Sequence, residues 1–188
     1  MSTEHTPKEY SIFQIAINLT ITCFISGIII AGVYFISHPV AVKNAAAKEM
    51  ETMQVLVPEA DKFTPIEGEE DWYAAEKGGE TIAYVVPGET KGYGGKIGML
   101  VAVNADGSVI DYQILVANET PGLGDKAGKE PFKSQIIGKT SDHLVVTKDA
   151  SNKEDVQAMT GATISSKAVT KGVKEAVDGV VEYVGGVK

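Results

Sequence analysis

The chain has 188 residues, a formal net charge of −8 at pH 7 and 44% hydrophobic residues, which is enough apolar surface for a folded core. All 17 basic residues are lysines, and this acidic balance excludes non-specific nucleic-acid binding, which needs cations that neutralise phosphates. The lone Cys23 excludes an intrachain disulfide framework, and the wide spacing of the three histidines excludes a local His-rich metal motif.

A long apolar segment lies near the N-terminus. No formal charge occurs between Glu9 and Lys43, and residues 12–36 within this interval are predominantly apolar. As a helix, residues 12–36 would be about 37 Å long, which exceeds the roughly 30 Å hydrocarbon core of a bilayer. The segment is too long for the core of a signal peptide and lacks a basic stretch before it. The lysines around it indicate orientation only weakly, because long domains translocate largely regardless of charge.

We therefore expect four parts in the chain: a short N-terminal tail (1–11), a transmembrane helix in contact with membrane lipid (12–36), a linker helix (37–58) and a soluble domain (59–188). Residues 44–57 are good helix formers, and Pro58 ends the linker helix. The span contains no ionisable carboxylate, so we do not expect this chain to form an ion path through the membrane.

The soluble domain begins with an acidic segment, which is followed by a segment that favours a β-strand. Residues 59–80 carry eight acids and two lysines, which we interpret as a solvated surface. Residues 81–86 predict a strand, which Pro87-Gly88 is expected to end.

The centre of the domain predicts a β-hairpin. Residues 96–104 and 108–117 are β-rich runs on either side of the turn Ala105-Asp106-Gly107. Apolar residues alternate along the first run, so we expect one buried face, formed by Ile97, Met99, Val101 and Val103.

The remaining patterns complete the predicted domain. Residues 144–147 indicate a further short strand, and residues 165–183 show apolar side chains at helical spacing. Together these elements predict an α+β fold with an antiparallel sheet flanked by helices.

Two loops contain candidate functional residues. The first is Glu119-Thr120-Pro121-Gly122-Leu123-Gly124. Pro121 fixes φ and the two glycines permit close backbone approach, so Leu123 is held at a loop tip where it can contact something flat or apolar. An ordinary tight turn is the alternative. Residues 122–127 also fit the loose GxGxxA dinucleotide pattern, but Gly128 and Pro131 interrupt the helix that a Rossmann fingerprint must open.

The second loop, residues 159–166, directly precedes the last predicted helix. Ser165 or Thr163 is expected to cap that helix. A helix N-terminus also offers free N–H donors and a partial positive charge, which favour a phosphate. We expect Thr163 to hold it, because Gly161 and Ala162 keep side-chain bulk away from the hydroxyl.

Three motifs resemble those of the FMN-binding domain family. Thr160-Gly161-Ala162-Thr163 is similar to the family's [S/T]-G-A-T flavinylation motif, and residues 119–124 are similar to its E-T-P-G-L-G loop. Residues 92–97, followed by the hairpin, are similar too, and the motifs occur in family order. A short chain with one N-terminal span most resembles the G subunits of Rnf complexes, the ion-translocating ferredoxin:NAD oxidoreductases. The C subunits of sodium-pumping NADH:quinone reductases are similar but longer.

The resemblance implies an electron-carrier subunit of a redox-driven ion translocase, with a single membrane span in the cell (inner) membrane and its domain on the extracytoplasmic side. It implies FMN joined covalently through its phosphate to the hydroxyl of Thr163 and installed by a separate flavin transferase. Its other partners would be membrane subunits of the Rnf complex.

The same resemblance assigns roles to the other motif residues. Thr160 and Ser165 are expected to bind the phosphate oxygens, with Gly161 and Ala162 giving room. Pro121 and Leu123 are expected to pack on the flavin ring, and Thr120 or the N–H groups of Gly122 and Gly124 to reach its polar edge.

One position departs from the family pattern. The aspartate usually found six residues before the modified threonine is Gln157 here, and Asp155 lies two residues earlier. If the transferase needs a carboxylate at the fixed offset, flavinylation would be slow or would use Asp155. Two alternatives stay open: the equivalent flavin subunit of a sodium-pumping NADH:quinone reductase, and a membrane-tethered binding or scaffold domain without flavin.

Overall fold

The computed structural model describes residues 11–186, without the side chains of residues 42, 45 and 46. Of the predicted tail (1–11), only Ser11 lies within the described residues. The chain forms two compact units that divide between Lys48 and Glu49. Helix α1 (Ile12–Leu56) begins in the first unit and ends in the second.

The first unit contains a helical segment fit to cross a membrane. Residues Ile12–Ala41 are apolar and long enough, and none of the most apolar stretch is buried. The hydroxyls of Thr20 and Thr22 donate to the carbonyls of Ala16 and Asn18 at 2.9 and 2.8 Å, so these polar groups are satisfied within the helix. The helix continues through Pro39, so the predicted span and linker helices are one element.

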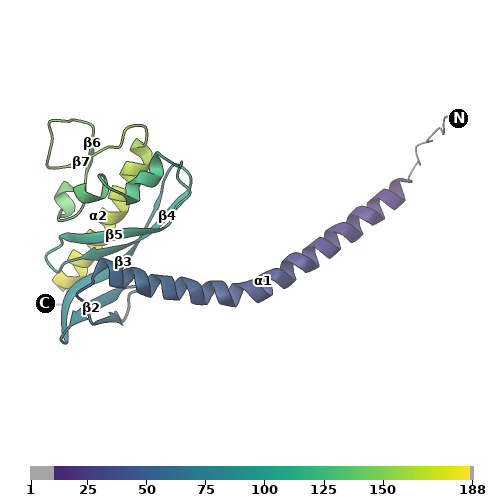
Figure 1. Ribbon diagram of the computed structural model, residues 1–188, viewed down its shortest axis with the longest axis horizontal. Coiled ribbons are helices and arrows are strands. Elements are labelled where there is room, and N and C mark those ends of the chain that lie inside the picture. The colour runs from purple at the N-terminus through teal and green to yellow at the C-terminus, as the bar shows by residue number, and fades with distance from the viewer. Residues whose placement is uncertain (1–10, 187–188) are drawn as a thin grey trace. The chain divides into compact units, whose positions relative to one another are not determined.

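The second unit is built on a five-stranded antiparallel sheet with strand order β1-β2-β3-β4-β5 (Figure 1). The strands are β1 (Lys62–Pro65), β2 (Tyr73–Lys77), β3 (Glu80–Lys91), β4 (Lys96–Val103) and β5 (Val109–Val116). The predicted hairpin is β4–β5, and Gly107 in its turn has φ of +83°. This arrangement confirms the predicted α+β class with an antiparallel sheet.

Strand β3 is longer than predicted, because Pro87-Gly88 does not end it. Pro87 pairs with Leu100 of β4, and β3 continues to Lys91. Pairing between β2 and β3 stops at Val85, so the second half of β3 has a strand on one side only. Proline is tolerated at such a sheet edge, where no ladder bond from its nitrogen is needed.

Both faces of the sheet are buried, where the alternation predicted one. Ile97, Met99, Val101 and Val103 pack in the same apolar cluster as α2 (Thr163–Gly186). Leu100 and Ala102 point to the opposite face and are buried in a second cluster. This cluster includes the last turn of α1 and the residues after it, Met53, Leu56, Val57 and Ala60.

The segment between β5 and α2 is mostly irregular. It contains the 3-10 turns η1 (Gly124–Gly128), η2 (Lys133–Gln135) and η3 (Ser141–His143). It also contains the short parallel pair β6 (Val146–Thr147) and β7 (Val156–Gln157). Only the last two residues of the predicted strand 144–147 are extended.

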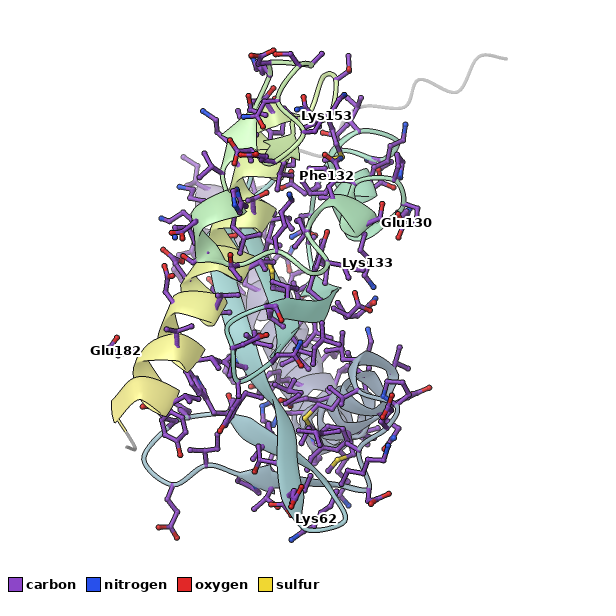
Figure 2. The ribbon with its side chains drawn as sticks, turned by 90° about the vertical axis from the view of Figure 1, so that its left-hand side faces the viewer. Lys62, Glu130, Phe132, Lys133, Lys153 and Glu182 are labelled. Carbon is purple, nitrogen blue, oxygen red and sulfur yellow. The ribbon has the colours of Figure 1, made fainter. Side chains whose placement is uncertain are left out.

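Side-chain contacts of Tyr112 and Asp111, together with backbone hydrogen bonds between Val109 and residues 138–139, fix the irregular segment to the sheet. The buried hydroxyl of Tyr112 donates to the Ala127 carbonyl at 2.5 Å. Burial raises the pKa of Tyr112 above its ordinary value, so the hydroxyl remains a neutral donor. Lys133, labelled in Figure 2, lies 2.8 Å from the Asp111 carboxylate in a mostly buried ion pair. The chain is thereby held close to β5 as it approaches α2.

Candidate functional site

A pocket of about 590 Å³ lies where three loops meet at the start of α2. The β3–β4 turn contributes Tyr93, and the loop after β5 contributes Thr120, Leu123 and Gly124. The α2 start contributes Gly161, Ala162, Thr163, Ile164 and Ser165. The volume lies in the range typical of small-molecule sites. The fold therefore gathers residues up to about 70 positions apart around one hollow.

The structure brings together most of the residues that the sequence singles out. Seven of them line the pocket: Thr120, Leu123, Gly124, Gly161, Ala162, Thr163 and Ser165. Thr160, Pro121 and Gly122 are exposed and lie next to lining residues without lining the pocket themselves. The two loops named in the sequence are therefore walls of one site.

Two lining residues were not among the predicted site residues. Tyr93 is 71% exposed and Ile164 is 55% exposed, and both are apolar side chains at the pocket, as is the 43% exposed Leu123. An aromatic residue flanked by Gly92 and Gly94 was the available signal for Tyr93. Ile164 gave none, because one apolar residue at a helix start has no periodicity to distinguish it. The three side chains offer a flat ligand an apolar surface.

The first turn of α2 offers unpaired donors to the pocket. Its first intrahelical bond runs from the Ser166 amide to the Ala162 carbonyl at 2.9 Å, so the N–H groups of residues 163–165 precede the ladder. Thr163 is half-buried, and its hydroxyl makes no hydrogen bond with any residue of the described chain 11–186. A hydroxyl without a hydrogen-bond partner in residues 11–186 and free N–H groups therefore meet at the positive end of a helix.

The predicted capping role of Thr163 and Ser165 is wrong. Thr163 is already the first helical residue, and Ser165 lies two residues further in. The Ser165 hydroxyl donates to a carboxylate oxygen of Glu119 and does not accept from the helix. Ser166 instead ties the turn together, since its hydroxyl accepts from the Met159 amide at 3.0 Å and donates to the Ala162 carbonyl at 2.9 Å.

Glu119 connects all three loops of the pocket. Its side chain is buried, at 9% exposure, and one oxygen accepts from the Gly94 amide at 2.9 Å. The other oxygen accepts from the Tyr93 amide at 3.3 Å and from the Ser165 hydroxyl. Hydrogen bonds to a charged acceptor are roughly twice as strong as neutral ones. A single carboxylate therefore fixes both Tyr93 and Ser165 relative to the loop after β5.

Glycines at these contacts, among them Gly94 and Gly124, permit the close approach of the loops. A Cβ on Gly94 would lie 1.8 Å from the Asn118 carbonyl oxygen, which is backbone and cannot move aside. A Cβ on Gly124 would lie 2.5 Å from the Ser165 hydroxyl and 2.7 Å from a Glu119 oxygen. Side chains at either position would therefore separate the loops that Glu119 joins.

Gln157 has a structural role in β7. Its side-chain amide donates to the carbonyls of Asp149 and Asn152, at 3.0 and 2.5 Å, and so closes the loop between β6 and β7. A carboxylate cannot donate these two bonds. Asp155 accepts from the Asn152 side-chain amide at 2.7 Å, and neither Gln157 nor Asp155 lines the pocket.

Known proteins with similar sequences belong to the family that the motifs indicate. The FMN-binding domain family model matches residues 92–178. The G subunit of the proton-translocating ferredoxin:NAD(+) oxidoreductase complex of Clostridium ljungdahlii is 61% identical over 178 residues, which are 95% of this chain and 96% of that protein. The G subunit of the Na(+)-translocating ferredoxin:NAD(+) oxidoreductase complex of Acetobacterium woodii is 42% identical over 56% of this chain and 52% of its own length.

A solved structure shares the fold. The crystal structure of the C subunit of the Na(+)-translocating NADH-quinone reductase from Parabacteroides distasonis aligns with 60% of this chain and 61% of its own, with a TM-score of 0.50 and 24% identity. At this level of identity the likeness concerns the fold alone.

Proposed function

This chain belongs to the G-subunit family of ferredoxin:NAD(+) oxidoreductase complexes and contains an FMN-binding domain, and from this membership we propose that it is a membrane-anchored electron-transfer subunit that carries FMN covalently on Thr163. The observation that carries the proposal is the setting of Thr163. Its hydroxyl lines a pocket at the start of α2, beside N–H groups that no helical carbonyl pairs.

The pocket fits the two chemically different ends of FMN. The α2 N-terminus supplies donors and a partial positive charge for a phosphate. Tyr93, Leu123 and Ile164 supply apolar surface for a flat ring. Gly161, at φ of +78°, keeps side-chain bulk away from the phosphate position.

FMN, when bound, supplies the electron chemistry, and the protein supplies position and environment. Thr163 anchors the phosphate, with Thr160 and Ser165 close to its oxygens. Leu123 and Pro121 pack near the ring, with Tyr93 on the side formed by the β3–β4 turn. Thr120 and the N–H groups of the glycine loop reach the polar edge. Glu119 holds two of these walls in place and stays out of the pocket itself.

A separate flavin transferase installs the FMN in this proposal. A threonine hydroxyl is a poor nucleophile until a base activates it. No side chain within residues 11–186 is hydrogen-bonded to the Thr163 hydroxyl, which supports modification by a separate enzyme. Gln157 closes a loop and does not line the pocket, so its side chain has no part in holding the FMN in this proposal.

The domain faces the extracytoplasmic side, and its partners are other membrane subunits of the Rnf complex. Residues 12–41 anchor the flavin domain at the membrane surface. Tethering raises the effective concentration of the domain near partner subunits. The equivalent subunit of a sodium-pumping NADH:quinone reductase is the second candidate, because the fold is shared with a C subunit of that enzyme.

The experiment is a denaturing gel of the full chain expressed with its flavin transferase. We expect flavin fluorescence at the protein band and an added FMN mass on the peptide that contains Thr163. Thr163→Ala should abolish both signals. Thr140→Ala, at an exposed threonine outside the pocket, is the matched control and should keep them. A colourless wild-type band would favour the scaffold alternative.

A further inference from the structure

The second unit is electrically polar along its length. Residues 59–80, which we call the acidic end, carry eight acids and two lysines. The segments around the pocket (89–96, 119–129 and 160–171), which we call the pocket end, carry six lysines and three acids. The two ends are far apart, because β3 runs from Glu80 to Lys91, a rise of about 35 Å for eleven residues.

The direction of α2 reinforces this polarity. Its first residue, Thr163, lies at the pocket, whereas Tyr183 near its other end contacts Trp72 of the acidic end. The positive pole of the helix dipole is therefore at the pocket end. Figure 2 shows Lys62 at one end of the domain, with Glu182 on the lower part of α2, and Lys153 at the opposite end.

Four exposed lysines form a continuous surface next to the pocket, which we call the basic face: Lys91, Lys96, Lys167 and Lys171. Lys167 and Lys171 follow Thr163 at successive intervals of four, so all three lie on one side of α2. Lys171 lines a surface hollow together with Lys91 and Lys96, which pair across the β3–β4 hairpin. The surface thus runs from the flavin attachment residue to the turn that carries Tyr93.

The basic face keeps a net positive charge. Lys96 lies 2.5 Å from the Glu89 carboxylate, and Lys171 lies 3.5 Å from Glu175. Lys91 and Lys167 have no ion pair within residues 11–186. Exposed pairs hold their partners weakly, so Lys96 and Lys171 are also available to a competing carboxylate.

We propose that the basic face docks an acidic surface on the redox partner subunit that exchanges electrons with the flavin. This inference rests on the proposed function, which places FMN on Thr163. Electrons must enter or leave at the pocket, so the partner has to approach the surface around it. Complementary charge raises the rate and fixes the orientation of such an encounter. The acidic end repels the same partner and so disfavours the reversed orientation.

Anionic lipid headgroups also attract lysines, but the observations favour a protein. The lysines lie beside the pocket, and contact with headgroups there would place lipid next to the flavin, where its redox partner has to approach. The membrane is therefore the competing outcome of the test.

The test uses zero-length carbodiimide cross-linking on the purified full complex, because this reagent joins a lysine amine to a carboxylate only where the two touch. We expect cross-links from the basic face to aspartate or glutamate of another subunit. Replacing the four lysines by Gln should remove them and slow NADH-driven reduction of the linked flavin about tenfold at low salt. The effect should fade towards 1 M salt, where the screening length is about 3 Å. Lys62→Gln at the acidic end is the matched control and should change neither result.

Three results would overturn the docking surface. Cross-links that come only from lysines elsewhere would place the partner on another face. Protection of the four amines from reductive methylation in anionic liposomes, with no cross-link to a subunit, would assign the face to the membrane. A fluorescent flavin band with an unchanged reduction rate in the variant would overturn the docking face alone, whereas absence of the band in wild type would remove the proposed function as well.

Discussion

The two ends of the sheet domain are stabilised in different ways. At the pocket end, segments far apart in the chain meet through directional hydrogen bonds to Glu119. At the acidic end, Trp72 and Tyr84 each pack on Tyr183, with ring centroids 6.0 and 5.9 Å from it. Apolar packing fills the space between segments, whereas hydrogen bonds at loop tips hold them apart at fixed distances. The two ends therefore differ in what joins their segments: a buried carboxylate bridges three loops at the pocket end, and aromatic rings pack together at the acidic end.

The largest expected effect is at Gly94, where the neighbouring backbone leaves no space for a side chain. In Gly94→Ala the new Cβ would meet the Asn118 carbonyl oxygen at 1.8 Å, so the turn and the Glu119 loop must separate. We expect a loss of about 3 kcal/mol or more in unfolding free energy and a protein that is not flavinylated. Chemical denaturation and in-gel fluorescence measure the two effects. Gly98→Ala is the control, because its Cβ would make only an ordinary 3.9 Å contact; equal behaviour of the two variants would contradict the close-approach argument.

The second-largest effect is expected at Trp72, where a change at the acidic end should leave the pocket end unaffected. Trp72→Ala removes a half-buried ring that packs against Tyr183 and Gly179, and we expect it to cost about 2–3 kcal/mol. Flavin content of the folded protein should stay at the wild-type level, because the cluster lies at the acidic end. Thermal unfolding and flavin absorbance per chain provide the measurements. A Trp72→Ala protein that folds but lacks flavin would show that the two ends are coupled.

A smaller change at Glu119 tests the hydrogen bonds directly. Glu119→Gln keeps the shape but turns one acceptor into a donor, which then faces the Tyr93 amide. We expect a loss of about 1–2 kcal/mol in unfolding free energy, together with a changed flavin absorbance spectrum because Tyr93 is released. Glu130→Gln, at an exposed carboxylate that within residues 11–186 accepts only from the Ser134 amide at 3.3 Å, should leave the spectrum unchanged. An unaltered spectrum in both variants would remove Glu119 from the control of Tyr93.

The smallest effect on stability is expected at Leu123. This side chain is 43% exposed at the pocket, so Leu123→Asp should change the unfolding free energy by no more than about 0.5 kcal/mol. It should nevertheless shift the flavin absorbance and midpoint potential, because it places a charge beside the ring. Val145→Asp, at a 50% exposed apolar residue outside the pocket, is the matched control. No shift relative to this control would exclude the glycine loop from the flavin site.

Much of the architecture was predictable because it depends on local patterns. Three local patterns each predict one element: the apolar segment after residue 11, the alternation in residues 97–103 and the helical spacing after Thr163. The flavin motifs were also readable, because each lies within a short segment. Where local rules failed, tertiary context was the reason: Pro87 is accommodated at a half-paired edge, and Leu100 is buried by the end of α1.

The amino-acid sequence by itself determined the membrane-helix candidate, the hairpin, the last helix and the two loops by which the family is recognised. Each of these features depends on residues that are close together in the sequence. Only the tertiary structure decided that Glu119 joins three loops, that Tyr93 and Ile164 complete the pocket, and that Gln157 closes a loop away from it. The Glu119 contacts join residues 25 to 46 positions apart, and the pocket is a hollow that three separate loops enclose. The periodicity of apolar residues in the sequence does not predict such contacts, because they form only when the sheet and α2 have packed.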